Sequence, residues 1–437
     1  SVMPKFVNRE QELRALTRAC NPGMAVVSGR RRVGKTALLD HFSTERASVF
    51  LPGTRAPIGE ALRRLEERVR AVVPPLAGDL LDLGHFETWD TALGYLIARS
   101  SDDPLLLVLD EFPYLCEADP SLPSTLQARW DHRGESQLSI ILAGSHVGLM
   151  EELVSTDAPL FGRPDMHLRL GPFSWQHAPL LVGGDDPDVW MEAYVTLGGM
   201  PRYLALWDPR HDAATNLAEL LDGPGAPLGD EGTVVLQELT PGSAAARVLE
   251  LVALDASTFT TIRDRAGLAP ATTSEALTSL ERLGLLDRIT PAGEDPRRTR
   301  KVRYRVRDPF LRLWLGVVLP HRDAFELGRG AAVLRRKADR IAASQAAAWR
   351  SVAADWMAEQ TGVSCGEWWG GPGEDVVDVL GMDGAHPVVA ASCHWAAGVD
   401  GGVWRDRLVQ AMSATPDEVH VMARSGTGVL TPAALHR

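Results

Sequence analysis

Eight residues near the N-terminus have the types and spacing of a loop that binds phosphate. The segment 29–36 reads GRRRVGKT and fits the pattern G-x-x-x-x-G-K-[ST]. Glycines let the backbone curve closely around an anion, and the N–H groups of the following helix N-terminus attract it. We expect Lys35 to reach the β- and γ-phosphates of ATP and Thr36 to bind Mg2+. The residues expected to contact the nucleotide here are Gly29, Arg31, Arg32, Val33, Gly34, Lys35, Thr36 and Ala37.

Two acids follow an apolar stretch further along the chain. Residues 105–109 are apolar throughout, which is typical of a central parallel strand buried on both faces. Asp110 and Glu111 come directly after it, and ligands of an open α/β sheet bind beyond the carboxyl ends of the strands. We expect Asp110 to hold Mg2+, directly or through water, and Glu111 to polarise the attacking water. The alternative is that both acids only close a core strand.

Three further candidates each have a structural alternative. Ser145 ends a predicted strand, where it could sense the γ-phosphate or only close a turn. Arg163 could stabilise γ-phosphate charge in its own chain or a neighbour's, or could pair with a surface acid. Segment 6–20 begins with Phe6 and Val7, which could pack beside the adenine or belong to a plain amphipathic helix.

The elements that position these residues alternate along the chain. Strands are predicted at 24–28, 47–51, 105–110, 138–143 and 166–170, with helices at 58–73, 88–99 and 121–133. This alternation predicts a P-loop NTPase core over residues 1–170, a parallel sheet with helices on both faces. Residues 171–236 are helix-patterned and rich in Gly and Pro, which favours a small helical lid with a linker at 222–229.

Residues 237–320 have the pattern of a winged helix. Helices are predicted at 244–254, 258–268 and 271–283, followed by a hairpin with the return strand 301–307. Apolar and basic residues alternate along this strand, so we expect the apolar side chains to face inward and the basic ones outward. Segment 297–307 is named here the basic wing. It could contact DNA phosphates, form a solvated face, or bind another part of the chain. The third helix carries Glu275 and Glu281, which are poorly suited to reading bases. The basic residues of the wing are Arg297, Arg298, Arg300, Lys301, Arg303, Arg305 and Arg307.

Composition limits the classes of protein that fit. The length of 437 residues predicts two to four domains. A net charge of −12 argues against a protein that coats nucleic acid indiscriminately, while allowing a local basic patch. The four cysteines are scattered without zinc spacing, as in a reducing compartment. No stretch is long and apolar enough for a membrane helix and the N-terminus lacks a signal-peptide pattern, so we expect a cytoplasmic protein.

Five motifs taken in order resemble those of the prokaryotic archaeal-type ATPases of the AAA+/STAND group. They are GRRRVGKT (29–36, Walker A), LDEFPYL (109–115, Walker B), AGS (143–145), FGR (161–163) and LGGMPRYL (197–204). The resemblance extends over essentially the whole chain. It implies binding of Mg-ATP by Lys35, Thr36 and Asp110, with Glu111 as the catalytic acid, and a winged helix after the ATPase module.

Many such proteins end in a domain similar to PD-(D/E)xK nucleases, and residues 335–437 resemble it as an α/β restriction-endonuclease-like domain. The strand at 376–380 places Asp378 where the pattern needs Asp, but Ser392 and His394 stand where Glu-x-Lys is needed. Because one carboxylate binds Mg2+ weakly, we expect a nuclease-like fold without nuclease chemistry. The alternative is substitution by Glu374, Asp375 or His394. Three tryptophans could form a docking surface or only pack the core: Trp368, Trp369 and Trp395.

Three functional hypotheses follow from these observations. The first is a Mg-dependent ATPase that acts as a conformational switch toward an unidentified protein partner. The second is an ATP-gated DNA-binding regulator or defence component that uses the basic wing. The third is an ATP-regulated DNA nuclease, against which Ser392 and His394 argue. No sequence pattern indicates the oligomeric state.

Overall fold

The chain divides into two compact units, residues 1–172 and 173–437, called here the N-terminal and C-terminal units. The computed structural model describes residues 6–75, 78, 80, 84–239, 242–370, 376–412 and 414–436. Glu374 and Asp375, the possible substitutes for lost nuclease residues, lie outside the described residues.

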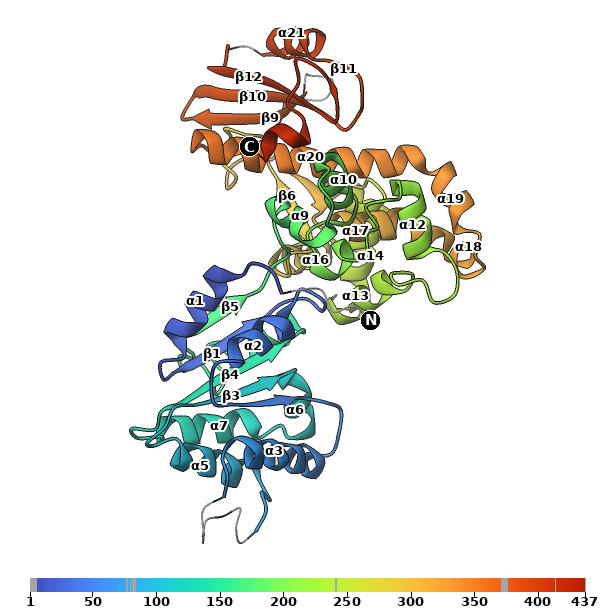
Figure 1. The fold of residues 1–437 in the computed structure, drawn as a ribbon. Helices are drawn as coiled ribbons and strands as arrows, with labels where there is room; N and C mark the ends of the chain where they lie inside the picture. Colours follow the sequence, from blue (N-terminus) through green and yellow to red (C-terminus); the bar gives the residue numbers. More distant parts are fainter. Residues whose placement is uncertain are drawn as a thin grey trace. The chain divides into compact units, whose positions relative to one another are not determined.

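A five-stranded parallel sheet forms the centre of the N-terminal unit (Figure 1). Its strands are β1 (Met24–Ser28), β2 (Ser48–Pro52), β3 (Leu105–Asp110), β4 (Leu138–Gly144) and β5 (Met166–Arg169). Their order is β2-β3-β4-β1-β5, and every neighbouring pair is parallel. The predicted α/β fold is therefore confirmed. Because β4 lies between β1 and β3, its end lies beside both the phosphate loop and the two acids.

Helices cover both faces of this sheet. On one face lie α3 (Ile58–Val72), α5 (Trp89–Arg99) and α7 (Leu122–Asp131), whose buried side chains share a core with alternate residues of β1 to β4. On the other lie α1 (Glu10–Ala19) and α2 (Lys35–Ser43), as Figure 1 shows. Every residue of β1, β3 and β4 is buried. This two-sided burial explains why these strands are nearly continuous apolar runs. The shorter helices α6 (Phe112–Ala118) and α8 (Val147–Glu152) follow β3 and β4.

The C-terminal unit begins with short helices over the segment predicted as a lid. They are η1 (Trp175–His177), α9 (Ala178–Val182), α10 (Pro187–Leu197), α11 (Pro201–Leu204), α12 (Ala213–Leu221) and α13 (Glu231–Leu239). The predicted linker at 222–229 instead packs within the unit. The Asp222 carboxylate accepts hydrogen bonds from the N–H groups of Gly330 and Ala331 at 2.6 and 3.0 Å, and Leu228 is fully buried. Gly and Pro in this stretch therefore mark a compact turn and not a free connection.

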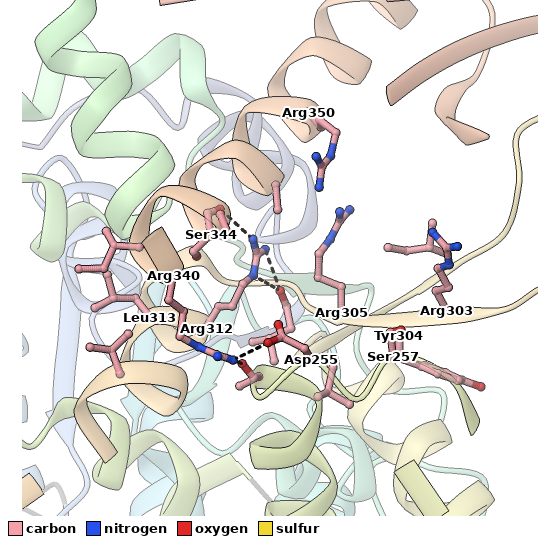
Figure 2. Close-up of a pocket in the computed structure, with 18 of the residues that line it drawn as sticks. Asp255, Ser257, Arg303, Tyr304, Arg305, Arg312, Leu313, Arg340, Ser344 and Arg350 are labelled. Carbon is pink, nitrogen blue, oxygen red and sulfur yellow. Dashed lines mark hydrogen bonds and ion pairs between the residues drawn. The ribbon is translucent and has the colours of Figure 1, made fainter. Parts of the chain in front are cut away.

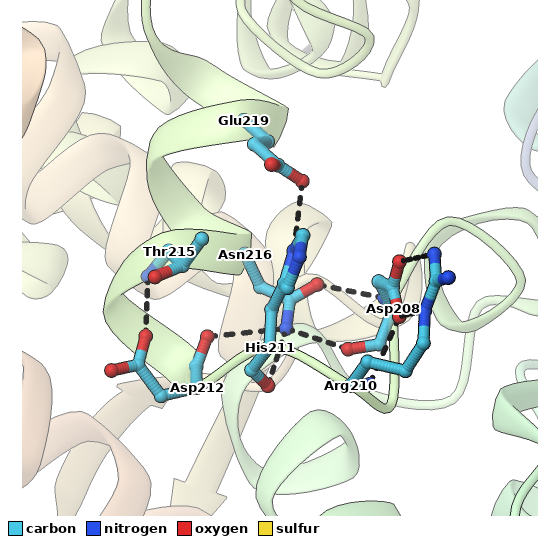
Figure 3. Close-up of polar contacts among 7 residues, drawn as sticks. All are labelled: Asp208, Arg210, His211, Asp212, Thr215, Asn216 and Glu219. Carbon is cyan, nitrogen blue, oxygen red and sulfur yellow. Dashed lines mark hydrogen bonds and ion pairs between the residues drawn. The ribbon is translucent and has the colours of Figure 1, made fainter.

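A polar cluster fixes the turn before α12 (Figure 3). The buried Asn216 side chain accepts from the Asp208 N–H at 2.8 Å and donates to the carbonyls of Asp208, His211 and Asp212 at 3.0 to 3.1 Å. Asp212 caps the helix by accepting from the Thr215 N–H at 2.8 Å. One buried amide thus supplies the partners that this turn cannot obtain from a helix or a sheet.

Three helices and a hairpin follow. They are α14 (Gly242–Ala253), α15 (Phe259–Ala266), α16 (Pro270–Arg282), β6 (Leu286–Ile289) and β7 (Arg303–Val306), and the two strands are antiparallel. Leu277 and Leu280 of α16 and Val248 and Leu249 of α14 are buried. Three helices and a hairpin thus lie where we predicted them, with boundaries shifted by a few residues, and their assignment to a winged helix stays a prediction.

The chain continues through α17 (Pro309–Leu313), η2 (Trp314–Val318), η3 (Leu319–His321), α18 (Arg322–Glu326) and α19 (Gly330–Arg336) into the long helix α20 (Ala338–Thr361). A mixed sheet of order β12-β10-β9-β8 comes next. Its strands are β8 (Cys365–Trp369), β9 (Val376–Asp383), β10 (His386–His394) and β12 (Glu418–Ala423). α21 (Gly401–Ala411) connects the parallel pair β10 and β12. The remaining elements are β11 (Val399–Asp400), β13 (Gly426–Thr427) and α22 (Pro432–Leu435).

The core of this last part lies between α20 and the sheet. Trp349, Val352 and Met357 of α20 pack with Val379 and Val389 of the strands. Over the ranges that the structure describes, no helix combines the length and apolarity needed to cross a bilayer.

Candidate functional site

The phosphate loop connects the end of β1 to the start of α2. A Cβ at Gly29 would lie 2.6 Å from the Leu170 carbonyl oxygen, and Gly34 has a φ of 97°. Both positions therefore need glycine. Lys35 is buried, and its Nζ donates to the carbonyl oxygens of Gly29 and Arg30 at 2.7 and 3.3 Å. The ammonium group thus lies against the curve of the loop. Among the other predicted contacts, Val33 is buried, Arg32 and Gly34 are half-buried, and Arg31, Thr36 and Ala37 are exposed.

The predicted magnesium ligands lie next to each other. The Thr36 hydroxyl donates to Oδ2 of Asp110 at 2.9 Å. Asp110 is 4% exposed, and this burial raises the pKa of its carboxyl group, although the hydrogen bond from Thr36 opposes the rise. A hydroxyl and a buried carboxylate are hard oxygen donors of the kind Mg2+ prefers. The buried carboxylate also gains from a nearby cation, so these residues fit a magnesium ion bound together with nucleotide phosphates.

Glu111 is held by Ser145. The Ser145 hydroxyl lies 2.9 and 2.8 Å from the two carboxylate oxygens of Glu111, and the Ser145 N–H donates to Oε2 at 3.1 Å. Glu111 has a φ of 48°, a conformation that is uncommon without glycine and that recurs at functional sites. The end of β4 therefore fixes the direction of the carboxylate. Sequence reasoning proposed a phosphate sensor or a turn for Ser145 and missed this contact.

Arg163 lies near the amino-terminal ends of the strands, opposite to the ends that carry the phosphate loop. Its guanidinium pairs with Asp131 at 3.0 Å and donates to the Phe161 carbonyl at 2.7 Å. Asp131 ends α7, and nearby Asp165 donates its N–H to Met24, the first residue of β1, at 2.7 Å. The phosphate loop follows the last residue of β1. The surface-acid alternative is thus the contact observed, and this position places Arg163 away from its own chain's phosphate loop.

The N-terminal segment reveals a residue that sequence reasoning missed. Arg9 is buried, and its guanidinium donates to the carbonyl of Val33 in the phosphate loop at 3.4 Å and to that of Gly171 at 2.8 Å. Its backbone has a φ of 106°. No spacing in the sequence indicated this role, since a charged residue before a helix is usually solvated. The ring of Phe6 stacks on His41 at 4.2 Å, so one of its faces is occupied, and Val7 is half-buried.

Most of the basic wing carries acidic partners. Arg305, which we expected on the outer face, pairs with Glu367 of β8 and is only 20% exposed. Arg303 lies over the ring of Trp369, 4.2 Å from its centroid. These two positions correct the prediction of an outward basic face, because β8 covers that side of β7. Three further ion pairs are Lys301–Glu294 at 2.9 Å, Arg307–Asp287 at 2.6 Å and Arg298–Asp295 at 3.4 Å.

An arginine lies beside Asp378, the residue that the sequence places at the Asp position of a nuclease pattern. Asp378 accepts a hydrogen bond from the Cys393 N–H at 2.9 Å and lies 3.7 Å from the Arg350 guanidinium. The Ser392 hydroxyl lies 2.8 Å from Nε2 of His394. Within the described ranges, no group of three His, Cys, Asp or Glu side chains could hold a metal ion.

The tryptophans of this region pack inward. Trp369 is 6% exposed, Trp368 packs against a buried cluster, and Trp395 contacts Trp349 with ring centroids 5.4 Å apart.

Comparison with known proteins agrees with the N-terminal site. Residues 6–206 match a family described as an ATPase domain predominantly from Archaea. An uncharacterised protein of Methanocaldococcus jannaschii is 24% identical over 333 residues, which are 74% of this chain and 71% of that protein.

Two solved structures are similar to this chain at low sequence identity. A Walker-type ATPase of Pyrococcus abyssi superposes with a TM-score of 0.52 at 20% identity, covering 72% of this chain and 99% of that chain. The ORC2 protein of Aeropyrum pernix gives a TM-score of 0.47 at 15% identity, covering 74% and 97%. The family match, the P-loop NTPase fold and the phosphate loop with its two acids agree on an ATP-binding ATPase domain over residues 6–206.

Proposed function

We propose that this protein is a Mg-dependent ATPase that uses ATP binding and hydrolysis as a conformational switch. One observation carries the proposal. The Thr36–Asp110 pair and the Ser145–Glu111 pair lie at neighbouring strand ends beside the phosphate loop. The first pair provides metal ligands and the second an oriented carboxylate, which are the two polar functions that phosphoryl transfer to water requires.

The residues of the chain divide the chemical work. Lys35 and the backbone N–H groups after Gly34 would bind the phosphates and stabilise their negative charge. Magnesium, when bound by Thr36 and Asp110, would neutralise charge on the phosphate oxygens. Glu111, held by Ser145 at both carboxylate oxygens, would accept a proton from the attacking water.

The switch function is supported by contacts between the phosphate loop and the segment that leads out of the N-terminal unit. Gly29 lies directly against Leu170, and Arg9 connects Val33 of the loop to Gly171. The next residues along the chain begin the C-terminal unit. A change in loop conformation on hydrolysis would therefore act directly on the connecting backbone.

The test compares two variants with matched controls in the full chain. Lys35→Ala should greatly weaken ATP binding in calorimetry, whereas Lys301→Ala, an exposed lysine, should not. Glu111→Gln should bind Mg-ATP nearly as tightly as wild type and slow single turnover by roughly 10²–10⁴-fold. Glu117→Gln, half-exposed on α6, is its control. Unchanged ATP affinity in Lys35→Ala or unchanged turnover in Glu111→Gln would refute the site assignment.

Contact with DNA gains little support from the basic wing. Its arginines and lysine are largely paired with acids or covered by β8, and each such pair lowers the charge available to phosphates. DNA binding by another surface would appear as a change in ATP turnover when DNA is added.

A further inference from the structure

A cavity of about 690 Å³ lies inside the C-terminal unit, between the hairpin, α17 and α20 (Figure 2). Its volume is in the range of small-molecule sites, roughly 300–1,000 Å³. A second cavity of about 420 Å³ shares Arg305, Arg312, Arg350 and Glu367 with it. The two spaces thus adjoin along one set of arginines, which lies outside the matched ATPase domain.

Positive charge is in excess in the larger cavity. Five arginines line it, Arg303, Arg305, Arg312, Arg340 and Arg350, against three acids, Asp255, Asp339 and Glu367. They come from the consecutive elements β7 and α17 and from α20, which begins later in the chain, at Ala338. Figure 2 shows the guanidinium groups of Arg305 and Arg350 directed toward each other. On a chain of net charge −12, a concentration of arginines inside a cavity calls for a physical reason.

The acids present satisfy these arginines only in part. Arg305 shares Glu367 with Arg350, whose guanidinium lies 3.8 Å from that carboxylate through Nε and 3.7 Å from Asp378 through Nη1. The Nε atoms of Arg305 and Arg350 are buried and have no hydrogen-bond partner within the described part of the chain. Buried donors of this kind are costly, and native structures normally satisfy them.

Arg312 lies in the same region of excess positive charge. It donates to the carbonyls of Val306 at 2.9 Å and Ser344 at 3.0 Å, which fixes its guanidinium at the cavity wall. Burial together with the charges of Arg305 and Arg350 lowers the pKa of Arg312 to about 9, although the acids Asp287 and Asp308 oppose this shift. An anion in the cavity would relieve this repulsion.

We propose that this cavity binds a small phosphate-bearing anion of the pyrophosphate or nucleoside diphosphate type, recognised by Arg305, Arg312 and Arg350. Guanidinium groups present paired N–H donors that match phosphate oxygens. The site is separate from the phosphate loop and does not depend on ATP hydrolysis.

A small anion fits this site better than a nucleic acid. The arginines lie in a recess, Arg305 being 20% and Arg350 29% exposed, whereas nucleic acid binding needs cations along an accessible surface. Three exposed cations around the hairpin, Arg298, Lys301 and Arg307, are paired with acids. A long polyanion would also be repelled by the net negative charge of the protein.

The test uses the full chain carrying Lys35→Ala, which suppresses binding at the phosphate loop. Calorimetry with inorganic pyrophosphate and then with ADP should show one site per chain. If ADP binds more tightly than pyrophosphate, the nucleoside contributes, and equal affinities identify the phosphates alone as the ligand.

Three variants in that background locate the site. Arg350→Gln should weaken binding about tenfold or more, as expected for a lost charged hydrogen bond. Asp339→Asn should tighten it measurably, because it removes a negative charge from the rim. Arg298→Gln, 89% exposed in the basic wing, should leave it unchanged. Circular dichroism verifies folding, and Asp339 is exposed, so its variant keeps the test valid if Arg350→Gln does not fold.

The proposal is overturned if neither pyrophosphate nor ADP binds at millimolar concentration. It is also overturned if Arg350→Gln and Asp339→Asn both bind these anions with the affinity of the Lys35→Ala parent. Binding of a 5′-phosphorylated oligonucleotide without binding of either small anion would overturn it in favour of nucleic acid. Each result is independent of ATP turnover by the wild-type chain, so this proposal and the proposed ATPase function fail separately.

Discussion

At the scale of single residues, the contact between Ser145 and Glu111 is the detail with the most chemical consequence. A general base must point at its water in a defined geometry, and an unrestrained glutamate side chain has several rotamers. Both carboxylate oxygens of Glu111 lie within 3 Å of the Ser145 hydroxyl. Ser145 therefore acts in the proposed mechanism as a positioning residue.

Removing this hydroxyl should reduce turnover without removing the base. We expect Ser145→Ala to lower the single-turnover rate by roughly 10- to 100-fold, the range found for partners that orient an active group. ATP affinity should stay near wild type, and Ser145→Thr should restore most of the rate. Ser139→Ala, buried near the start of the same strand, is the control. A wild-type rate in Ser145→Ala would show that Glu111 needs no such support.

Arg163 supports a second prediction at this scale. Because it pairs with Asp131 at the amino-terminal edge of the strands, Arg163→Ala should leave the Kd for ATP of dilute protein unchanged. A loss of turnover that grows with protein concentration would indicate action on a neighbouring chain. Weaker binding in dilute protein would instead show that Arg163 reaches its own nucleotide, contrary to the geometry described above.

At the scale of elements, the turn before α12 depends on one buried amide. Asn216 is 1% exposed and makes four hydrogen bonds to backbone groups of the turn. Asn216→Ala leaves these groups without partners, so we expect a loss of about 1–3 kcal/mol in the free energy of unfolding of this unit. Glu219→Ala, on an exposed position of the same helix, should change it by less than about 0.5 kcal/mol. Denaturant titration followed by circular dichroism measures both, and equal effects would contradict the role of Asn216.

The same turn predicts a dependence on pH. Hydrogen bonds from Arg210 lower the pKa of Asp208, and those from Thr215 lower the pKa of Asp212. For an acid whose pKa is lower in the folded state, the added stability exists above the unfolded pKa of about 4 and is lost as pH falls through the folded pKa. Acid should therefore destabilise this turn below about pH 4. Asp212→Asn should flatten the dependence of the melting temperature on pH in that window, and an unchanged slope would contradict this.

At the scale of the whole molecule, the C-terminal sheet is the part whose residues are least suited to catalysis. Asp378 faces Arg350 and the Cys393 N–H, and an arginine beside a lone carboxylate opposes binding of a divalent cation. We expect no cleavage of single- or double-stranded DNA with Mg2+ or Mn2+. Asp378→Ala should leave ATP turnover intact. Metal-dependent cleavage that disappears in Asp378→Ala would make the protein an ATP-regulated nuclease instead.

The sequence by itself determined those features that are built from residues adjacent in the chain. The phosphate loop needs only the spacing of Gly29, Gly34, Lys35 and Thr36, and a local turn between a strand and a helix builds it. The fold class followed equally, because strands buried on both faces must be apolar at every position. Strand ends were therefore predicted within about two residues, as for 47–51 against Ser48–Pro52.

Only the tertiary structure decided which distant residues meet. Ser145 reaches Glu111 across 34 positions because β4 lies between β1 and β3. Arg305 meets Glu367 across 62 positions because β8 covers the hairpin, so a strand pattern that favoured an outward basic face was wrong there. Period-two alternation states which side chains share a face, but not whether solvent or another strand covers that face. The cavity of arginines arises for the same reason, since α20 becomes a neighbour of β7 and α17 only on folding.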